Sequence, residues 1–134
     1  MPSMTDRPPN AASDAVGAAA QDFAAAFSAR DIATAATFFA SDGMLKLLDQ
    51  PAVAGRDAIA LALAEGIETA GLGLLEIHTA TVLPTTAAGR VREMGVFTVD
   101  STTADGFTLI ERAYTITWDV TGPCGPRIVF ARFD

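Results

Sequence analysis

Chemically versatile side chains are scarce in this chain of 134 residues, which has one histidine, one cysteine, one tyrosine and one tryptophan. The single cysteine, Cys124, excludes an internal disulfide and any metal site that needs several thiolates. Because His78 is the only histidine, zinc sites built from several His and Cys ligands are excluded as well. We therefore expect no metal site, and we interpret His78 as a surface residue and Cys124 as a passive thiol.

Basic residues are also few, since 9 Lys and Arg against 16 Asp and Glu give a formal net charge of -7. An acidic chain repels phosphate backbones and anionic lipid, so nucleic acid is not an expected partner. No apolar run approaches the roughly 20 residues of a membrane span, and the first residues lack an apolar signal segment. We expect a cytoplasmic protein that does not enter a membrane.

Signatures of cofactor binding are missing too. There is no P-loop and no nucleophile elbow, and Gly71-Leu72-Gly73 is too short for a dinucleotide fingerprint. No cofactor is expected. What the chain does have is hydrophobic residues at 50% of positions and only 19% charged residues. Those proportions and the length predict one domain with a sizeable core, over residues 13–134, after a flexible tail over residues 1–12.

Hydrophobic periodicity predicts helices first and strands afterwards. A helix is expected from Ser13 or Asp14 to about Ala29, a second begins at Asp31, and a third runs over residues 56–70. Ser41-Asp42-Gly43 reads as a turn between the second helix and a strand. Strands are predicted over residues 44–48, 74–83, 90–100, 106–120 and 127–133. Helices followed by an antiparallel run of strands indicate an α+β fold.

The order of these segments resembles a known superfamily. Ala26 to Ile59, with Arg92-Glu93-Met94-Gly95-Val96-Phe97 and Ala113-Tyr114-Thr115-Ile116-Thr117-Trp118, is similar to the nuclear transport factor 2-like superfamily, in its SnoaL-like and ketosteroid isomerase-like branch. The resemblance implies a cone in which a curved antiparallel sheet wraps around three N-terminal helices and leaves an internal apolar pocket. It also implies a homodimer formed through the sheet. The mildly polar face that carries Met94, Val96 and Leu109 agrees with such packing.

Strand alternation selects the candidate catalytic residues. The strand after Gly106 places Arg112, Tyr114, Ile116 and Trp118 on one face, and the preceding strand places Glu93 and Phe97 on one face. Pairing Glu93 opposite Arg112 brings unlike charges together and puts the more apolar faces of the two strands on the same side of the sheet. We therefore predict that Glu93, Arg112 and Tyr114 point into the cone as base, electrostatic partner and oxyanion donor. A self-satisfied interior ion pair that only fixes the strand register is an equally weighted alternative.

The isomerase resemblance can be examined at single positions. The family's general base falls on Leu47 and its first-helix tyrosine falls on Phe23, and neither side chain can do the required job. The second oxyanion donor falls near Tyr114. Asp49, two residues further along, is the alternative base, but its place beside Gln50-Pro51 favours a turn residue. Steroid isomerisation by the family mechanism is therefore not expected.

Two functions stay open at this point. The first is a protein that binds a small apolar or carbonyl ligand, and that acts on it, if it is an enzyme, as a cofactor-free isomerase, cyclase or hydratase. The second is a non-catalytic module for dimerisation or association whose pocket is closed. An open cavity of at least ~300 Å³ that reaches the three candidate groups would distinguish the first from the second. The expected pocket lining is Phe23, Phe27, Leu47, Phe97, Ile116 and Trp118.

Overall fold

The structure is a computed structural model that describes residues 8–134. Within these residues, three helices and six strands follow one another. They are α1 (Pro8–Ser28), α2 (Ile32–Thr37), β1 (Phe39–Leu47), β2 (Val53–Ala54), α3 (Arg56–Thr69), β3 (Leu72–Pro84), β4 (Arg90–Thr103), β5 (Gly106–Asp119) and β6 (Arg127–Phe133). The α+β class predicted from the sequence is confirmed.

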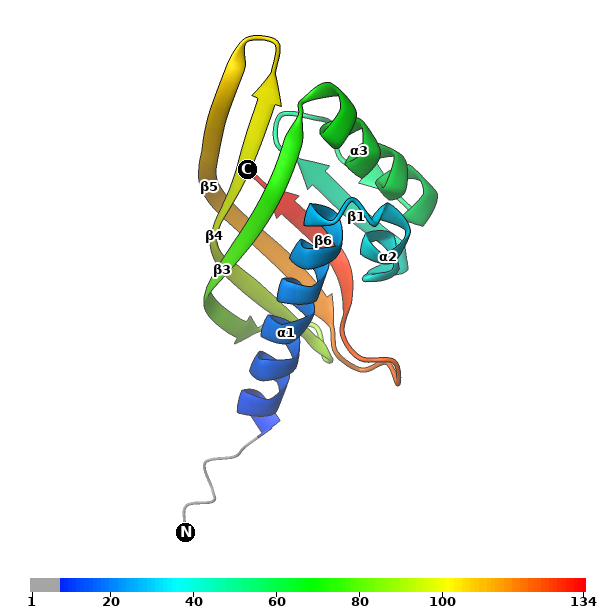
Figure 1. Cartoon of the computed structure of the whole chain (residues 1–134). Coiled ribbons are helices and arrows are strands. Elements are labelled where there is room, and N and C mark those ends of the chain that lie inside the picture. Colours follow the sequence, from blue (N-terminus) through cyan, green and yellow to red (C-terminus); the bar gives the residue numbers. More distant parts are fainter. Residues whose placement is uncertain (1–7) are drawn as a thin grey trace.

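The six strands form one curved sheet in the order β2-β1-β6-β5-β4-β3. Figure 1 shows α1 running along the open side of this sheet, with α2 and α3 beside it near β1. All neighbouring strands are antiparallel except β1 and β6, which run parallel. This pair departs from the purely antiparallel sheet predicted above. Two strands can run parallel only when a long connection joins them, and the segment between β1 and β6 contains most of the chain.

The ends of the first two helices test the capping signals in the sequence. Asp31 caps α2, because its Oδ1 atom accepts a hydrogen bond from the Thr34 amide at 3.2 Å, as predicted. Helix α1 begins at Pro8, earlier than the cap expected at Ser13. The predicted tail therefore overlaps the helix, and its residues 1–7 lie outside the described part of the chain.

The turn predicted at Ser41-Asp42-Gly43 is instead an irregularity inside β1. The register against β6 shifts between Phe39, which pairs with Ile128, and Met44, which pairs with Phe130. A Cβ atom on Gly43 would lie 2.8 Å from the Ile128 carbonyl oxygen, so the bulge needs glycine at this position. The strand consequently starts at Phe39, before the predicted start at Met44.

The core lies between α1, α3 and the concave face of the sheet. Aromatic rings dominate it: Phe23 packs edge-on against Phe38 and Phe39 and stacks on Phe133, with ring centroids 5.8–6.3 Å apart. Each fully buried phenylalanine contributes about 1.5–3 kcal/mol relative to an exposed one. One face of α1 carries apolar residues at helical spacing, and these are buried, namely Val16, Ala20, Phe23, Ala24 and Phe27.

Helix α1 also covers the free edge of β3. The Ser28 hydroxyl accepts a hydrogen bond from the Leu75 amide at 2.9 Å and donates to the Leu75 carbonyl at 3.3 Å. About two helical turns earlier in α1, Gln21 Nε2 donates to the Ile77 carbonyl at 2.7 Å. These side chains occupy backbone groups that an edge strand would otherwise present to another chain. Among residues 8–134, no helix is both long enough and apolar enough to cross a bilayer.

Candidate functional site

Glu93 lies at the centre of a buried polar cluster. Its strand, β4, places it on the concave face, and its side chain has no solvent exposure. Oε1 accepts a hydrogen bond from Trp118 Nε1 at 2.9 Å, and Oε2 accepts one from Thr79 Oγ1 at 2.7 Å and another from the Tyr114 hydroxyl. Both carboxylate oxygens are therefore engaged by protein donors. The inward orientation predicted for Glu93 and Tyr114 is what the structure shows.

The predicted ion pair between Glu93 and Arg112 is wrong. Glu93 lies opposite Ile116, and Arg112 lies opposite Phe97, so the hairpin register differs from the predicted one by four positions. Because side chains alternate with a period of two, this even shift keeps every side chain on its predicted face while separating the two charges. The cause is the loop: Thr103 pairs with Gly106, which is a tighter turn than the break predicted from Ser101 to Asp105.

Arg112 lies instead at the rim of the sheet. Its guanidinium is 3.7 Å from Asp49 Oδ1 and donates to the Asp134 carbonyl at 3.2 Å. The side chains of Arg112 and Asp49 are 45% and 90% exposed, so solvent screens the pair and its contribution to stability is small. The three predicted catalytic residues thus separate into a buried pair, Glu93 and Tyr114, and a surface arginine.

The polar cluster has a clear electrostatic consequence for its phenol. Burial raises the pKa of the Tyr114 hydroxyl far above its usual value, and the hydrogen bond to Glu93 raises it further. Tyr114 therefore stays a neutral donor wherever the protein is folded. The arrangement matches the alternative in which these groups satisfy one another, although the partners are hydroxyls and an indole in place of a guanidinium.

The apolar interior of the cone is almost filled by side chains. A cavity of only about 10 Å³ remains between α1, α3 and the sheet, with space for roughly one water molecule. Four of the predicted pocket residues line it, Phe23, Phe27, Leu47 and Phe97. Ile116 and Trp118 are fully buried but do not line this cavity. A space of this size is too small for an organic ligand, so the ligand pocket predicted inside the cone stays a prediction.

A larger pocket of about 490 Å³, which we call the outer pocket, opens between β1 and α3. Helix α3 forms one wall and the chain from β1 to β2 forms the other. Its lining is mostly apolar and comprises Leu45, Leu47, Leu48, Asp49, Gln50, Pro51, Val53, Ala58, Leu61, Ala62, Glu65, Gly66, Thr69, Ala70 and Leu72. Of the predicted site residues, only Leu47 belongs to it.

Small residues on α3 create this pocket. Ala58, Ala62 and Gly66 follow one another at one-turn spacing, so one face of the helix carries almost no side-chain volume. A Cβ atom on Gly66 would lie 3.0 Å from Leu72 Cδ1 and 3.1 Å from Leu47 Cδ2. Those two leucines line both the outer pocket and the interior cavity, and they separate the two spaces. Small residues at one-turn spacing are visible in the sequence, but they indicate a pocket only together with the position of β1.

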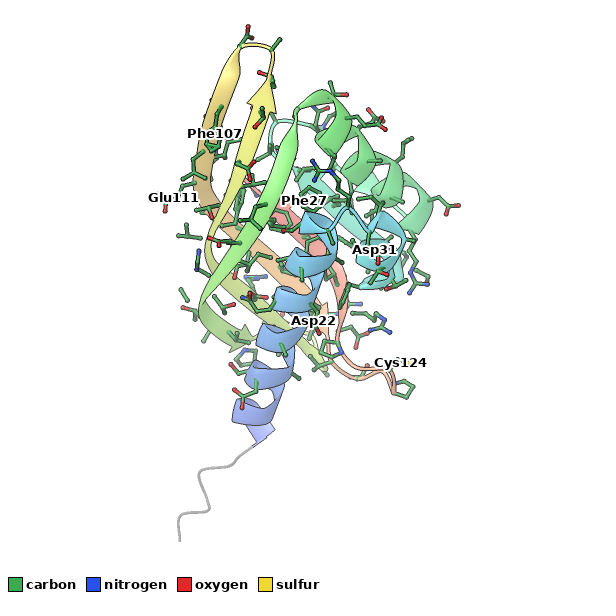
Figure 2. The ribbon with its side chains drawn as sticks, in the orientation of Figure 1. Asp22, Phe27, Asp31, Phe107, Glu111 and Cys124 are labelled. Carbon is green, nitrogen blue, oxygen red and sulfur yellow. The ribbon has the colours of Figure 1, made fainter. Side chains whose placement is uncertain are left out.

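The remaining chemically versatile residues lie elsewhere. Figure 2 shows Phe27 inside the molecule, Phe107 and Glu111 pointing away from β5, and Cys124 on the loop between β5 and β6. His78 lies on β3, where its imidazole is exposed and 3.9 Å from Glu76. Within residues 8–134, no group of three or more His, Cys, Asp or Glu side chains is arranged to hold a metal ion.

The fold matches solved structures closely, although the sequences are distant. A ketosteroid isomerase-like protein from Erwinia carotovora atroseptica aligns with a TM-score of 0.74 and 20% identity, over 89% of this chain and 92% of the other. An NTF2-like protein with a cystatin-like fold from Novosphingobium aromaticivorans gives a TM-score of 0.67 at 16% identity, over 95% and 88% of the two chains.

A third neighbour, a proposed scytalone dehydratase from Novosphingobium aromaticivorans, gives a TM-score of 0.71 at 16% identity, over 89% of this chain and 80% of the other. No family model and no curated protein sequence matches the chain. The chain therefore has the fold of the nuclear transport factor 2-like superfamily, as its segment order predicted. At these identities the likeness extends to the fold alone.

Proposed function

We propose that this protein binds a small, largely apolar molecule in the outer pocket between α3 and β1. The observation that carries the proposal is the volume of that pocket, about 490 Å³, within the range of sites that enclose small organic ligands. Its floor contains Leu45 and Leu72, both almost completely buried, so a ligand there would leave water for a hydrocarbon surface. The neighbours with enzyme names suggest a ligand-binding use of this fold, but they do not identify the ligand.

The geometry favours binding over catalysis through Glu93. Neither cavity is lined by Glu93 or Tyr114, and each oxygen of the carboxylate already accepts a hydrogen bond from a protein group. A general base must reach the proton that it abstracts, directly or through one water molecule. Acting as a base would require Glu93 to give up partners that currently keep its buried oxygens paired.

The pocket is tested with N-phenyl-naphthylamine, a neutral probe whose fluorescence rises in apolar sites. We expect saturable binding to the intact protein at one site per chain. Ala62→Trp places an indole in the pocket and should abolish the signal, whereas Ala25→Trp, at an exposed position of α1, should not change it. Circular dichroism is used to check that both variants are folded. Unchanged affinity in folded Ala62→Trp would refute this location.

The role of Glu93 is tested in the same assay. Glu93→Gln keeps the shape of the side chain and an oxygen that can accept from Trp118. If Glu93 is structural, the affinity for the probe should stay within about twofold of that of the unmodified protein. A loss of tenfold or more would place Glu93 in the ligand site and return it to the list of catalytic candidates.

A second candidate function is association through the outer face of the sheet, and a specific observation favours it. Val96, Phe107 and Leu109 are 41%, 64% and 62% exposed on β4 and β5, on the face opposite the core. Clustered exposed apolar side chains on a sheet are characteristic of contact surfaces. We propose that this face forms a homodimer, which is compatible with ligand binding because α3 and β1 lie away from it.

A further inference from the structure

The ionisable side chains that line the outer pocket are all acidic. Among its lining residues, Asp49 and Glu65 are the ionisable ones, and none is basic. They come from opposite walls, since Asp49 follows β1 and Glu65 belongs to α3. Gln50 and Thr69 add uncharged hydrogen-bonding groups near the same walls. The overall charge of -7 adds to the negative potential at the mouth.

Two cations, Lys46 and Arg112, lie near the pocket without lining it, and Arg112 offsets part of the negative charge of Asp49. The amine of Lys46 donates to the Leu48 carbonyl at 2.6 Å and does not line the pocket. Arg112 is 3.7 Å from Asp49, but both side chains are solvent-exposed, and pairs of this kind are worth at most about 1 kcal/mol. With its side chain 90% exposed, Asp49 keeps room for another partner.

The wall that carries Asp49 is held in place by backbone contacts. The Leu48 amide donates to the Phe133 carbonyl at 2.8 Å, and the Gln50 amide donates to the Leu47 carbonyl at 3.1 Å. Leu48 has a φ of 53°, a conformation that turns the chain sharply after β1. The carboxylate is therefore presented at a defined edge of the apolar floor, and a ligand would meet it without first ordering a loop.

We propose that the ligand of this pocket is an amphiphilic monocation, with an apolar body on the leucine floor and a protonated amine or quaternary ammonium at the acidic rim. This inference rests on the proposed function, because it assigns a ligand class to the same pocket. The apolar part supplies most of the affinity through burial, and the charge supplies selectivity between ligands of equal size. Anionic amphiphiles of the same size are disfavoured by Asp49 and Glu65.

The test is a matched series that competes with N-phenyl-naphthylamine: decyltrimethylammonium and decyl sulfate below their micelle concentrations, and decanol below its solubility limit. The cation should bind roughly tenfold more tightly than the anion, with the alcohol between them, and added salt should reduce the difference. Glu65→Gln and Asp49→Asn should each weaken binding of the cation about two- to fivefold and leave decanol unchanged. Glu111→Gln removes the same charge from the outer face of β5 and should have no effect.

The outcomes separate the two proposals. If the cation and the anion compete equally well, or the anion competes better, the assignment of ligand class is overturned while the pocket stands. If N-phenyl-naphthylamine itself does not bind the intact protein, the proposed function fails and the ligand class fails with it. Equal weakening of cation and alcohol in the Glu65 and Asp49 variants would show a change of pocket shape and would also overturn the role of charge.

Discussion

At the scale of single residues, the buried carboxylate is stabilised without a neighbouring cation. Glu93 is surrounded by a phenol, a hydroxyl and an indole, each of which can donate a hydrogen bond to it. Removing the carboxylate would leave these donors buried and unpaired, at a cost of about 1–3 kcal/mol for each group. The cluster thus connects β3, β4 and β5 through their side chains on the concave face, and its most direct consequence is structural.

Tyr114 gives this cluster a measurable pH dependence. Burial and the hydrogen bond to Glu93 raise the pKa of Tyr114 in the folded state, whereas an unfolded chain loses the same proton near pH 10. Above that pH the unfolded state binds fewer protons than the folded state, so stability falls as pH rises. We expect a loss of about 1.4 kcal/mol for each pH unit above pH 10, measured by urea unfolding.

Because Tyr114 is the only tyrosine and Trp118 the only tryptophan, two optical probes report on one cluster. Tyrosinate absorbance should appear only when tryptophan fluorescence shows unfolding. Tyr114→Phe removes the ionising group and should show a shallower loss of stability over the same pH range. Tyrosinate absorbance in a chain that is still folded would contradict a raised pKa.

The sequence was sufficient to orient these residues but not to pair them. Alternation along β4 and β5 placed Glu93, Tyr114 and Trp118 on the concave face, because the pleat has a period of two whatever the register. Which residues face each other across the hairpin depends on the position of the turn. Charge complementarity favoured Arg112 as the residue opposite Glu93 by at most about 1 kcal/mol. The tight turn before Gly106, where φ is 120°, outweighed that preference.

At the scale of secondary-structure elements, α1 protects the edge of β3. We expect Ser28→Ala to lower the free energy of unfolding by about 1–2 kcal/mol, because the amide and carbonyl of Leu75 both lose their partner. Amide hydrogen exchange should accelerate at Leu75 and stay unchanged at Phe97 on the neighbouring strand β4. Ser41→Ala, at an exposed position of β1, should change stability by less than about 0.5 kcal/mol. Equal effects of the two substitutions would contradict the role of Ser28.

The small residues of α3 are the reason why the outer pocket could not be predicted from the sequence. Ile59, Leu63 and Ile67 lie one turn apart on α3, where Ile59 and Leu63 are buried and Ile67 is partly buried against the core. Periodicity does not show where side chains are too small to fill the space beside a helix. Whether such a space exists beside α3 depends on how far β1 lies from it. Ala58 and Ala62 have high helix propensity and look ordinary in one dimension. Only the position of the neighbouring strand turns them into the wall of a pocket.

At the scale of the whole molecule, the filled cone and the outer pocket are related by packing. Large rings occupy the interior and leave about 10 Å³, while small residues on α3 leave about 490 Å³ on the far side of Leu47 and Leu72. Both spaces are therefore set by side-chain size on the same framework, so the fold alone does not determine where a ligand binds. The proposed binding at the outer pocket would leave the opposite face of the sheet free for the proposed second copy.

The proposed homodimer is tested on that opposite face. Val96→Lys combined with Leu109→Lys introduces charges where two sheets would meet, so we expect sedimentation velocity to show a monomer in place of a dimer. Leu61→Lys changes an equally exposed leucine on α3 and should leave the dimer intact, because α3 lies away from the outer face of the sheet. A monomeric unmodified protein at micromolar concentration, or a dimer that survives the double substitution, would show that this face is not the contact surface. Dissociation by both variants would instead place the contact at α3, in competition with the pocket.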